Sequence, residues 1–391
     1  MATRSLAFLA LAVDAVVMLL TAGSLPAFAA AYRVPQDVAG LVFTANGVGF
    51  VLTVPLAGVL ADRYGKRAVA AVSALVVALG LLLFSVSGNL AAGLCAAALI
   101  GAGGGSVESL VTAILPEMYP GREGFANNFA QMFFSVGATL GPLLLLPAGW
   151  PWRLRLALCG VTFALIAAGL WRQRGSDVPE RRGLRGGAWW AAPGWDLRRS
   201  GVWPSVVAMI LYTGVEVALW GWLFAVVTRP GGAGPVWAVA ELSGFWCAMG
   251  VGRLVTGVLA ERIDLARLIG IEAALGVPTL LLALLLHSRV GALTAVILCG
   301  LALSGIWPSL VAHGQVRHGQ SASLAALLVA AGGAGSLAVP AAFGFASAHL
   351  GLPAAAAGLA VLLAPVAVLP ALAPGRRARG RSDSQAGGPA A

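Results

Sequence analysis

The sequence Gly58-Val-Leu-Ala-Asp62-Arg63-Tyr-Gly65-Lys66-Arg67 forms a short charged turn between two long apolar runs. Only 10% of the residues in the chain are charged, so this concentration of charge is unusual. Gly58 and Asp62 are four residues apart and lie on one face of a helix. A neighbouring helix can approach closely at a glycine and direct its positive N-terminal end toward a carboxylate. A basic loop between any two membrane helices would explain the charges, but not the two glycines.

The turn has a copy 199 residues later, where Gly257-Val-Leu-Ala-Glu261-Arg262 differs from the first six residues only by Glu in place of Asp. A second pair of similar segments, Gly137–Pro142 and Gly335–Pro340, is offset by 198 residues. Two halves of similar length that carry the same marks in the same order are typical of a duplicated transporter fold.

The composition predicts a membrane protein with several spans, because 59% of the residues are hydrophobic and the mean hydropathy is +0.89. The first apolar stretch, from Leu6, is followed by more of the same, and we interpret it as the first membrane helix and not as a cleaved signal peptide. All four cysteines fall within apolar runs, so we expect no disulfide, no metal site and no cofactor.

Apolar runs of about 20 residues predict an all-α membrane protein with twelve transmembrane helices in two pseudo-symmetric six-helix bundles. We expect an N-terminal bundle (1–171), a cytoplasmic linker (172–200), a C-terminal bundle (201–375) and a disordered cytoplasmic tail (376–391). The expected spans are 6–30, 38–61, 67–87, 90–115, 124–148, 154–171, 202–227, 237–260, 266–287, 290–313, 320–346 and 352–373.

Most of the arginines fall on one side of these spans, which places both termini and the linker in the cytoplasm of a multi-pass protein of the cell membrane. The net charge of +10 therefore reflects orientation in the lipid bilayer, and we expect no nucleic-acid partner. We expect the chain to function as a monomer.

Three carboxyl groups lie well inside predicted spans, at Asp14, Glu108 and Glu216. A charge at the centre of a membrane costs about 2.5–3.5 kcal/mol on insertion scales, so each acid needs a reason to be there. We interpret the three as candidates for proton coupling; polar contacts between packed helices are the alternative. Glu241 and Glu272 lie nearer predicted span ends, where we expect them to snorkel and serve a structural role.

A second group of intramembrane residues is a candidate for solute binding. Arginine keeps its charge, so an arginine within a span needs a carboxylate or a solute oxygen as its partner. Tryptophan rings can stack on the apolar faces of a sugar, although tryptophan also anchors membrane helices at the interface. The candidates are Asn128, Gln131, Tyr212, Trp220, Trp222, Trp246, Arg253 and Trp307.

Over nearly its whole length the chain resembles the major facilitator superfamily, and the segment 58–67 resembles the signature of the loop between helices 2 and 3 in that superfamily. The resemblance implies that this turn locks helix 2 against helix 11 in the outward-open state. It assigns gating to Gly58, Asp62, Arg63, Gly65, Lys66 and Arg67, and to Gly257, Glu261 and Arg262 in the copy, which lacks the second Gly and the Lys.

Three segments (127–137, 212–222 and 245–253) resemble the fucose–proton symporter group and its relatives. In that group an Asp in helix 1 and a Glu in helix 4 serve proton coupling and sugar binding, roles that the resemblance assigns to Asp14 and Glu108. The segment Gly137–Pro142 instead resembles the helix 5 motif of drug–proton antiporters. Helix 4 carries Glu108 and lacks the intramembrane Arg that is usual in those exporters, so efflux is the alternative function.

The sequence therefore favours a secondary transporter that moves a small polar, sugar-like solute together with protons. An ATP-driven pump would need a phosphate-binding Gly-rich loop, which the sequence lacks. A membrane-embedded enzyme would need a nucleophile beside a base, but Ser106 precedes Glu108 by two residues and points away from it on a helix. We therefore expect no enzymatic activity. A non-transporting receptor on the same fold is the remaining alternative.

The predicted topology can be tested with reporter fusions at Gly175 and at the C-terminus. Both reporters are expected to behave as cytoplasmic, because an even number of spans and the arginine distribution place these positions on one side. A periplasmic signal from either fusion would contradict the twelve-helix interpretation.

Overall fold

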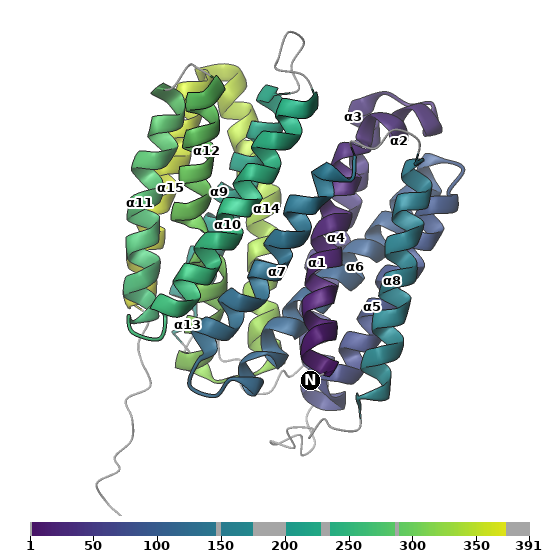
Figure 1. The fold of residues 1–391 in the computed structure, drawn as a ribbon, viewed down its shortest axis with the longest axis horizontal. Helices are drawn as coiled ribbons and strands as arrows, with labels where there is room; N and C mark the ends of the chain where they lie inside the picture. The colour runs from purple at the N-terminus through teal and green to yellow at the C-terminus, as the bar shows by residue number, and fades with distance from the viewer. Residues whose placement is uncertain (1, 146–149, 175–200, 228–234, 286–288, 373–391) are drawn as a thin grey trace, which may run out of the picture.

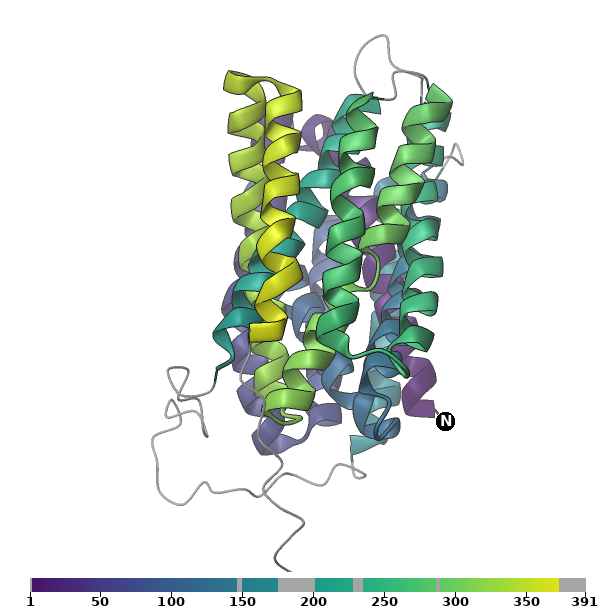
Figure 2. The same cartoon turned by 90° about the vertical axis from the view of Figure 1, so that its left-hand side faces the viewer.

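The computed structural model describes residues 2–145, 150–174, 201–227, 235–285 and 289–372, and these residues form helices and turns without a strand. The helices run roughly parallel along the height of the molecule (Figures 1 and 2). Their bounds are α1 Ala2–Gly23, α2 Leu25–Tyr32, α3 Gln36–Ala39, α4 Leu41–Tyr64, α5 Lys66–Val86, α6 Leu90–Ile114, α7 Glu123–Leu143, α8 Trp152–Arg172, α9 Trp203–Val227, α10 Pro235–Leu259, α11 Leu265–Leu285, α12 Arg289–Leu303, α13 Ile306–His318, α14 Ala322–Leu350 and α15 Leu352–Leu372.

Eleven stretches of the described helices are long and apolar enough to cross a membrane. The twelfth membrane helix is α7, which has a similar length and lies among the others (Figure 1) but carries the polar residues Asn127, Asn128 and Gln131. These amides lower its hydropathy without preventing the helix from being buried inside the bundle. The predicted all-α fold with twelve spans is therefore confirmed.

Two of the predicted spans are interrupted, which the sequence analysis missed. The first apolar run divides at Ser24 into α1 and α2, and Pro26 lies in the first turn of α2. The tenth divides at Ser304 and Gly305 into α12 and α13. Proline has no backbone N–H, so Pro308 cannot donate to the carbonyl of Ser304 as a continuous helix would require. That carbonyl is therefore left for a side chain from elsewhere.

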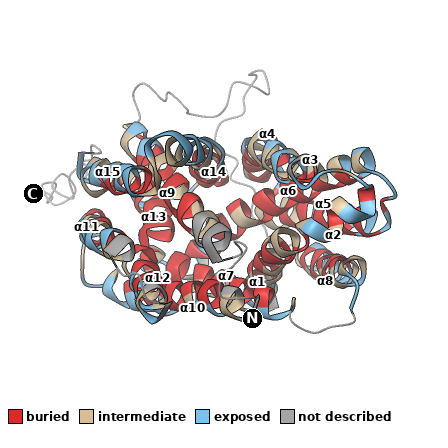
Figure 3. Cartoon of the chain, turned by 90° about the horizontal axis from the view of Figure 1, so that it is seen from above, coloured by how far each residue is buried: buried red, intermediate tan, exposed pale blue. Residues whose placement is uncertain are grey.

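The helices form two groups with an interface between them (Figure 3). In the first group α6 packs on α4 and α5, and α8 packs on α5 and α1. In the second group α9 packs on α14 and α15, and α11 packs on α12, α13 and α15. The groups meet mainly where α4 contacts α14 and where α7 contacts α10. The predicted bundle boundaries at 171 and 201 stay a prediction, and nearly all of the predicted linker (172–200) and the tail (376–391) lie outside the described residues.

The second sequence repeat corresponds to the same helix contact in both halves. A Cβ atom at Gly137 would collide with the backbone carbonyl of Ala12, so α7 and α1 touch through their backbones. A Cβ atom at Gly335 would collide with the carbonyl of Ile210, so α14 and α9 touch in the same way. Glycine at these positions allows a close backbone approach, as is usual between helices in lipid.

Gly137→Ala is expected to lower the unfolding temperature of the detergent-solubilised protein, because overpacking a tight contact costs about 1–3 kcal/mol. Gly358→Ala is the matched control, because a Cβ there would meet no atom within 4 Å. Alanine is also the better helix former, so the control is expected to be neutral or slightly stabilised. An unfolding temperature of Gly137→Ala equal to or above that of the control would contradict the contact.

Candidate functional site

One end of the molecule, which we call the Arg-rich end, contains the beginning of α1, the turn between α4 and α5 and the beginning of α14 (lower end of Figure 1). The Asp62 carboxylate accepts hydrogen bonds there from the backbone N–H groups of Ala322 (2.8 Å) and Ser323 (3.0 Å), and from the Ser323 hydroxyl. These N–H groups are the free donors at the N-terminus of α14. The helix contact expected at Asp62 is therefore present; its gating role stays a prediction.

Gly58 and Gly65 explain the two glycines of the motif. A Cβ at Gly58 would lie 2.5 Å from the Cβ of Ala326 and 2.9 Å from the carbonyl oxygen of Ala322, so only glycine lets α14 pack here. Gly65 joins α4 to α5 at a φ of 101°, in the region that favours glycine. Arg63 stacks over the Tyr64 ring at 5.2 Å from its centroid.

The remaining motif charges lie around the same turn. Lys66 forms an ion pair with Glu117, which follows α6, and Arg67 lies in the first turn of α5.

The copy of the motif makes a different contact. Gly257 of α10 packs on α7, where a Cβ would lie 3.2 Å from the Cβ of Asn128. Glu261, however, forms an ion pair with the Arg122 side chain beside the start of α7, and does not accept from backbone N–H groups as Asp62 does. Arg262 lies in the turn after α10, and Asp264 there caps α11 where the first copy has Gly65.

Further polar contacts tie the two halves together at the Arg-rich end. The Asn127 amide donates to Gln315 (3.3 Å), and the Gln320 amide donates to Glu123 (2.9 Å). Ala322 and Ala325 of α14 are fully buried against the core of the first half. The Arg-rich end is therefore closed between the halves.

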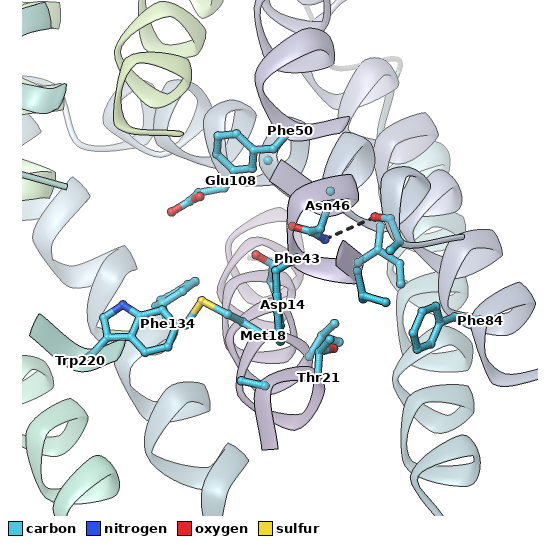
Figure 4. Close-up of a pocket in the computed structure, with 18 residues that line it drawn as sticks. Asp14, Met18, Thr21, Phe43, Asn46, Phe50, Phe84, Glu108, Phe134 and Trp220 are labelled. Atoms are coloured by element: carbon cyan, nitrogen blue, oxygen red, sulfur yellow. Dashed lines mark hydrogen bonds between the residues drawn. The ribbon is translucent and has the colours of Figure 1, made fainter. Parts of the chain in front are cut away.

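Two neighbouring cavities, of about 180 and 150 Å³, lie between the helices above this closed end. They share Met18, Phe50, Glu108, Phe134 and Trp220, so we treat them as one cavity system. The first cavity extends to residues near the opposite ends of α1 and α4, including Thr21 and Val42. Figure 4 shows its polar residues and the aromatic side formed by Phe134 and Trp220.

Asp14 of α1 and Glu108 of α6 both line the first cavity. A Cβ at Gly104 would lie 2.8 Å from Asp14 Oδ1, so the glycine makes room for that carboxyl. The Gln131 amide donates to Glu108 Oε1 at 3.2 Å. Among the described residues neither acid forms an ion pair.

The second cavity contains the third acid and the arginine. Glu216 Oε1 of α9 and Arg253 Nη2 of α10 are 3.8 Å apart, and both residues are buried. Arg253 Nη1 donates to the Gln131 carbonyl and the Ser135 hydroxyl, both at 2.8 Å, and Nε donates to the Ser304 carbonyl at 3.1 Å. Arg253 therefore joins α10 to α7 of the other half and satisfies the carbonyl left free by Pro308.

Three of the four tryptophan candidates face the cavity system. Trp220, Trp246 and Trp307 line the second cavity, and the Trp246 indole N–H is buried without an acceptor among the described residues. The side chain of Trp222 lies outside the described residues.

Two other candidates lie away from both cavities. Asn128 is fully buried between α7 and α13, where it donates to the Gly124 carbonyl and the Ser309 hydroxyl. Tyr212 is fully buried in the second half, and its hydroxyl donates to the Leu303 carbonyl at 2.6 Å.

Sequence analysis missed the cavity residues Asn46, Thr213 and Ser336. Asn46 of α4 lines the first cavity, and its amide donates to the Ala97 carbonyl at 3.4 Å (Figure 4). A single amide within the apolar span 38–61 was the signal that could have identified it. The expectation that Glu241 and Glu272 snorkel at span ends is wrong, because both residues are buried, and Glu272 accepts a hydrogen bond from Thr256 of α10.

Comparison with known proteins agrees with this architecture. The family model of the Major Facilitator Superfamily matches residues 7–325, so the chain belongs to this superfamily of membrane transporters. The uncharacterized MFS-type transporter YfkL of Bacillus subtilis (strain 168) is 33% identical over 104 residues, a match that covers 27% of this chain and 26% of YfkL.

Solved structures share the fold over nearly the whole chain. The E. coli fucose:proton symporter FucP is similar with a TM-score of 0.78 at 20% identity, over 96% of this chain and 99% of FucP. The proton:xylose symporter XylE has a TM-score of 0.76 at 14% identity, over 96% of each chain. The predicted superfamily and its fold are therefore confirmed.

Asp62→Asn is expected to loosen the Arg-rich end, because it removes the negative charge from the N-terminus of α14. Such contacts contribute about 0.3–1 kcal/mol when exposed and up to about 2 when partly buried, so the open fraction is expected to rise by about fivefold for each 1 kcal/mol. The readout is the alkylation rate of a cysteine placed at Ala325, in a chain whose native cysteines are replaced by alanine.

Ser323→Ala is the matched control for this experiment, because it removes one donor and leaves the charge and both N–H groups. An unchanged rate in Asp62→Asn, together with a large rise in Glu261→Gln, would place the main lock at the Glu261–Arg122 pair.

Proposed function

We propose that this chain is a proton-coupled symporter of a small polar, sugar-like solute in the cytoplasmic membrane. The observation that carries the proposal is the shared cavity system, which joins the Asp14 and Glu108 carboxyls to Gln131, Arg253 and the tryptophan rings. The residues that bind a proton and those that bind a solute can therefore influence each other directly.

The charge balance of the cavity system supports proton binding. Asp14, Glu108 and Glu216 face it, and Arg253 is the one basic residue among its lining residues. An unpaired buried charge is costly, so surplus carboxyls become neutral by taking up protons. A conformational change that admits water to Glu108 then allows its proton to leave, and this dependence on conformation is the requirement for coupling.

The chemistry of the cavity walls supports a polar solute with apolar faces. Gln131, Asn46, Thr213 and Ser336 offer hydrogen-bond donors and acceptors, and Trp220, Trp246 and Trp307 offer flat apolar surfaces. Sites of this kind position a ligand with a few polar groups in a mostly apolar cavity. FucP and XylE, which share the fold, are sugar–proton symporters.

Transport would proceed by rocking of residues 1–171 against 201–375 about the cavity system. The closed Arg-rich end corresponds to the state in which the solute enters from the opposite side. Because most of the described arginines lie at the closed end, we assign that end, both termini and the linker to the cytoplasm. A single chain contains both halves of the site, which supports a functional monomer.

Proton-coupled efflux is the second candidate function, and the packing of Gly137 favours it. The antiporter-like segment Gly137–Pro142 forms the backbone contact between α7 and α1, the helix that carries Asp14. Symport and antiport predict opposite solute movements for the same imposed pH gradient in proteoliposomes, so the sign of the flux separates them. A chain that binds solute without any flux would be a receptor.

Glu108→Gln is expected to keep solute binding and exchange of labelled for unlabelled solute, because the amide resembles the protonated carboxyl. It is expected to lose accumulation driven by a pH gradient, since it cannot release a proton. The measurement uses proteoliposomes and labelled fucose and xylose, after a thermal-shift screen of monosaccharides. Asp14→Asn tested in parallel separates the two acids. Full accumulation by Glu108→Gln would exclude Glu108 as the coupling acid.

A further inference from the structure

The second half contains a buried carboxyl that neither cavity includes. Glu272 of α11 is 7% exposed, and its Oε1 accepts a hydrogen bond from the Thr256 hydroxyl of α10. Its Oε2 is buried without a hydrogen-bond partner among the described residues. The carboxyl lies against the break between α12 and α13, because a Cβ at Gly305 would be 2.6 Å from Glu272 Oε1.

Packing alone does not require an acid at this position. The helix α11 begins at Leu265, which is 199 residues after the start of α5 at Lys66. The repeated motif has the same offset, so the residue of the first half that is equivalent to Glu272 is Ser73. Ser73 is 7% exposed, as buried as Glu272, and faces α6 near Gly103. The first half therefore fills the equivalent position with a small neutral residue.

The break connects Glu272 to the solute cavity. Arg253 donates to the carbonyl of Ser304 in the break, and Tyr212 donates to the carbonyl of Leu303, the last residue of α12 before it. Thr256, the donor to Glu272, lies one helical turn from Arg253 on α10. A movement of the break would therefore disturb Glu272 and the Arg253 contacts together.

The charged and titratable groups that face Glu272 are Arg253 of α10 and Tyr212 of α9. The guanidinium of Arg253 donates its hydrogen bonds to Gln131, Ser135 and Ser304, and none to Glu272. The helix α15, which also packs on α11, has no ionisable side chain, and His313 of α13 lies two turns beyond the break. A buried carboxyl without a hydrogen-bonded cation is most stable with a proton bound.

We propose that Glu272 is a second proton-carrying carboxyl of the transporter, linked to the solute cavity through the break between α12 and α13. The proposal rests on the proposed proton coupling. In the closed state of the Arg-rich end the Glu272 carboxyl keeps its proton. Because α13 packs on α7 of the other half, opening that end moves α13 relative to α12, admits water to the break and lets the O–H proton pass to a water molecule.

The test measures opening of the Arg-rich end without a solute. The readout is the alkylation rate of Ala325→Cys by a maleimide in proteoliposomes, in the cysteine-free chain, between about pH 5.5 and 8.5. Glu108→Gln is included in the background, so that Glu108 cannot titrate. In this background the alkylation rate is expected to change several-fold with pH. When Glu272→Gln is added, the alkylation rate is expected to become independent of pH.

Glu241→Gln is the matched control, because Glu241 is a buried carboxyl of α10 away from the break, and the pH response is expected to survive it. Thr256→Val, which removes the one hydrogen-bond donor to the carboxyl in the described part of the chain, is expected to shift the pH midpoint. If Glu272→Gln does not fold, Glu272→Ser introduces the residue of the first half and serves the same purpose.

The outcomes separate this proposal from the proposed function. A pH response that is unchanged by Glu272→Gln would overturn the role of Glu272. A response that is already absent in the Glu108→Gln background would also overturn it, while supporting Glu108 as the single coupling acid. A chain with both acids intact that shows no pH response would contradict proton coupling as a whole.

Discussion

The low polarity of the membrane interior constrains every charged group near the centre of this protein. Asp14, Glu108 and Glu216 face the cavity system, where Arg253 is the one basic residue, and Glu272 is buried behind it. Carboxyls that exceed the available cations are stable there only when protonated. The same constraint explains why Arg253 donates to three oxygen atoms, two on α7 and one at Ser304 in the break between α12 and α13.

The duplicated architecture supplies a stable frame for this charged centre. Glycines let helices approach through their backbones at equivalent places in both halves, as Gly137 and Gly335 do. The two copies of the charged turn have diverged in contrast. Asp62 binds the backbone of α14, whereas Glu261 forms a more exposed ion pair with Arg122. Salt screens an exposed ion pair, so we expect the Asp62 contact to be the less salt-sensitive of the two.

Sequence alone predicted the fold, because apolar run length and the repeated turn are local signals. It also singled out Asp14 and Glu108, which line the first cavity, because an acid within an apolar run is easily recognised. The sequence predicted a carboxylate or a solute oxygen as the partner of Arg253, and Glu216 lies 3.8 Å from it. Its other partners, the Gln131 and Ser304 carbonyls and the Ser135 hydroxyl, were not predictable because they are distant in the chain. Tyr212 was predicted to bind the solute, yet its hydroxyl donates to the Leu303 carbonyl at the helix break. Glu272 was misjudged although its span begins within one residue of α11, because the break that buries it, which Pro308 creates, is distant in the chain and was overlooked.

The central claim, that solute movement carries protons through buried carboxyls, is tested most directly by the external pH of an unbuffered proteoliposome suspension. Addition of a transported sugar, without an imposed gradient, is expected to make the external medium more alkaline as protons enter with the solute. The alkaline shift is expected to disappear when a proton-permeable uncoupler is present. Uptake of labelled sugar at an unchanged external pH would contradict the claim.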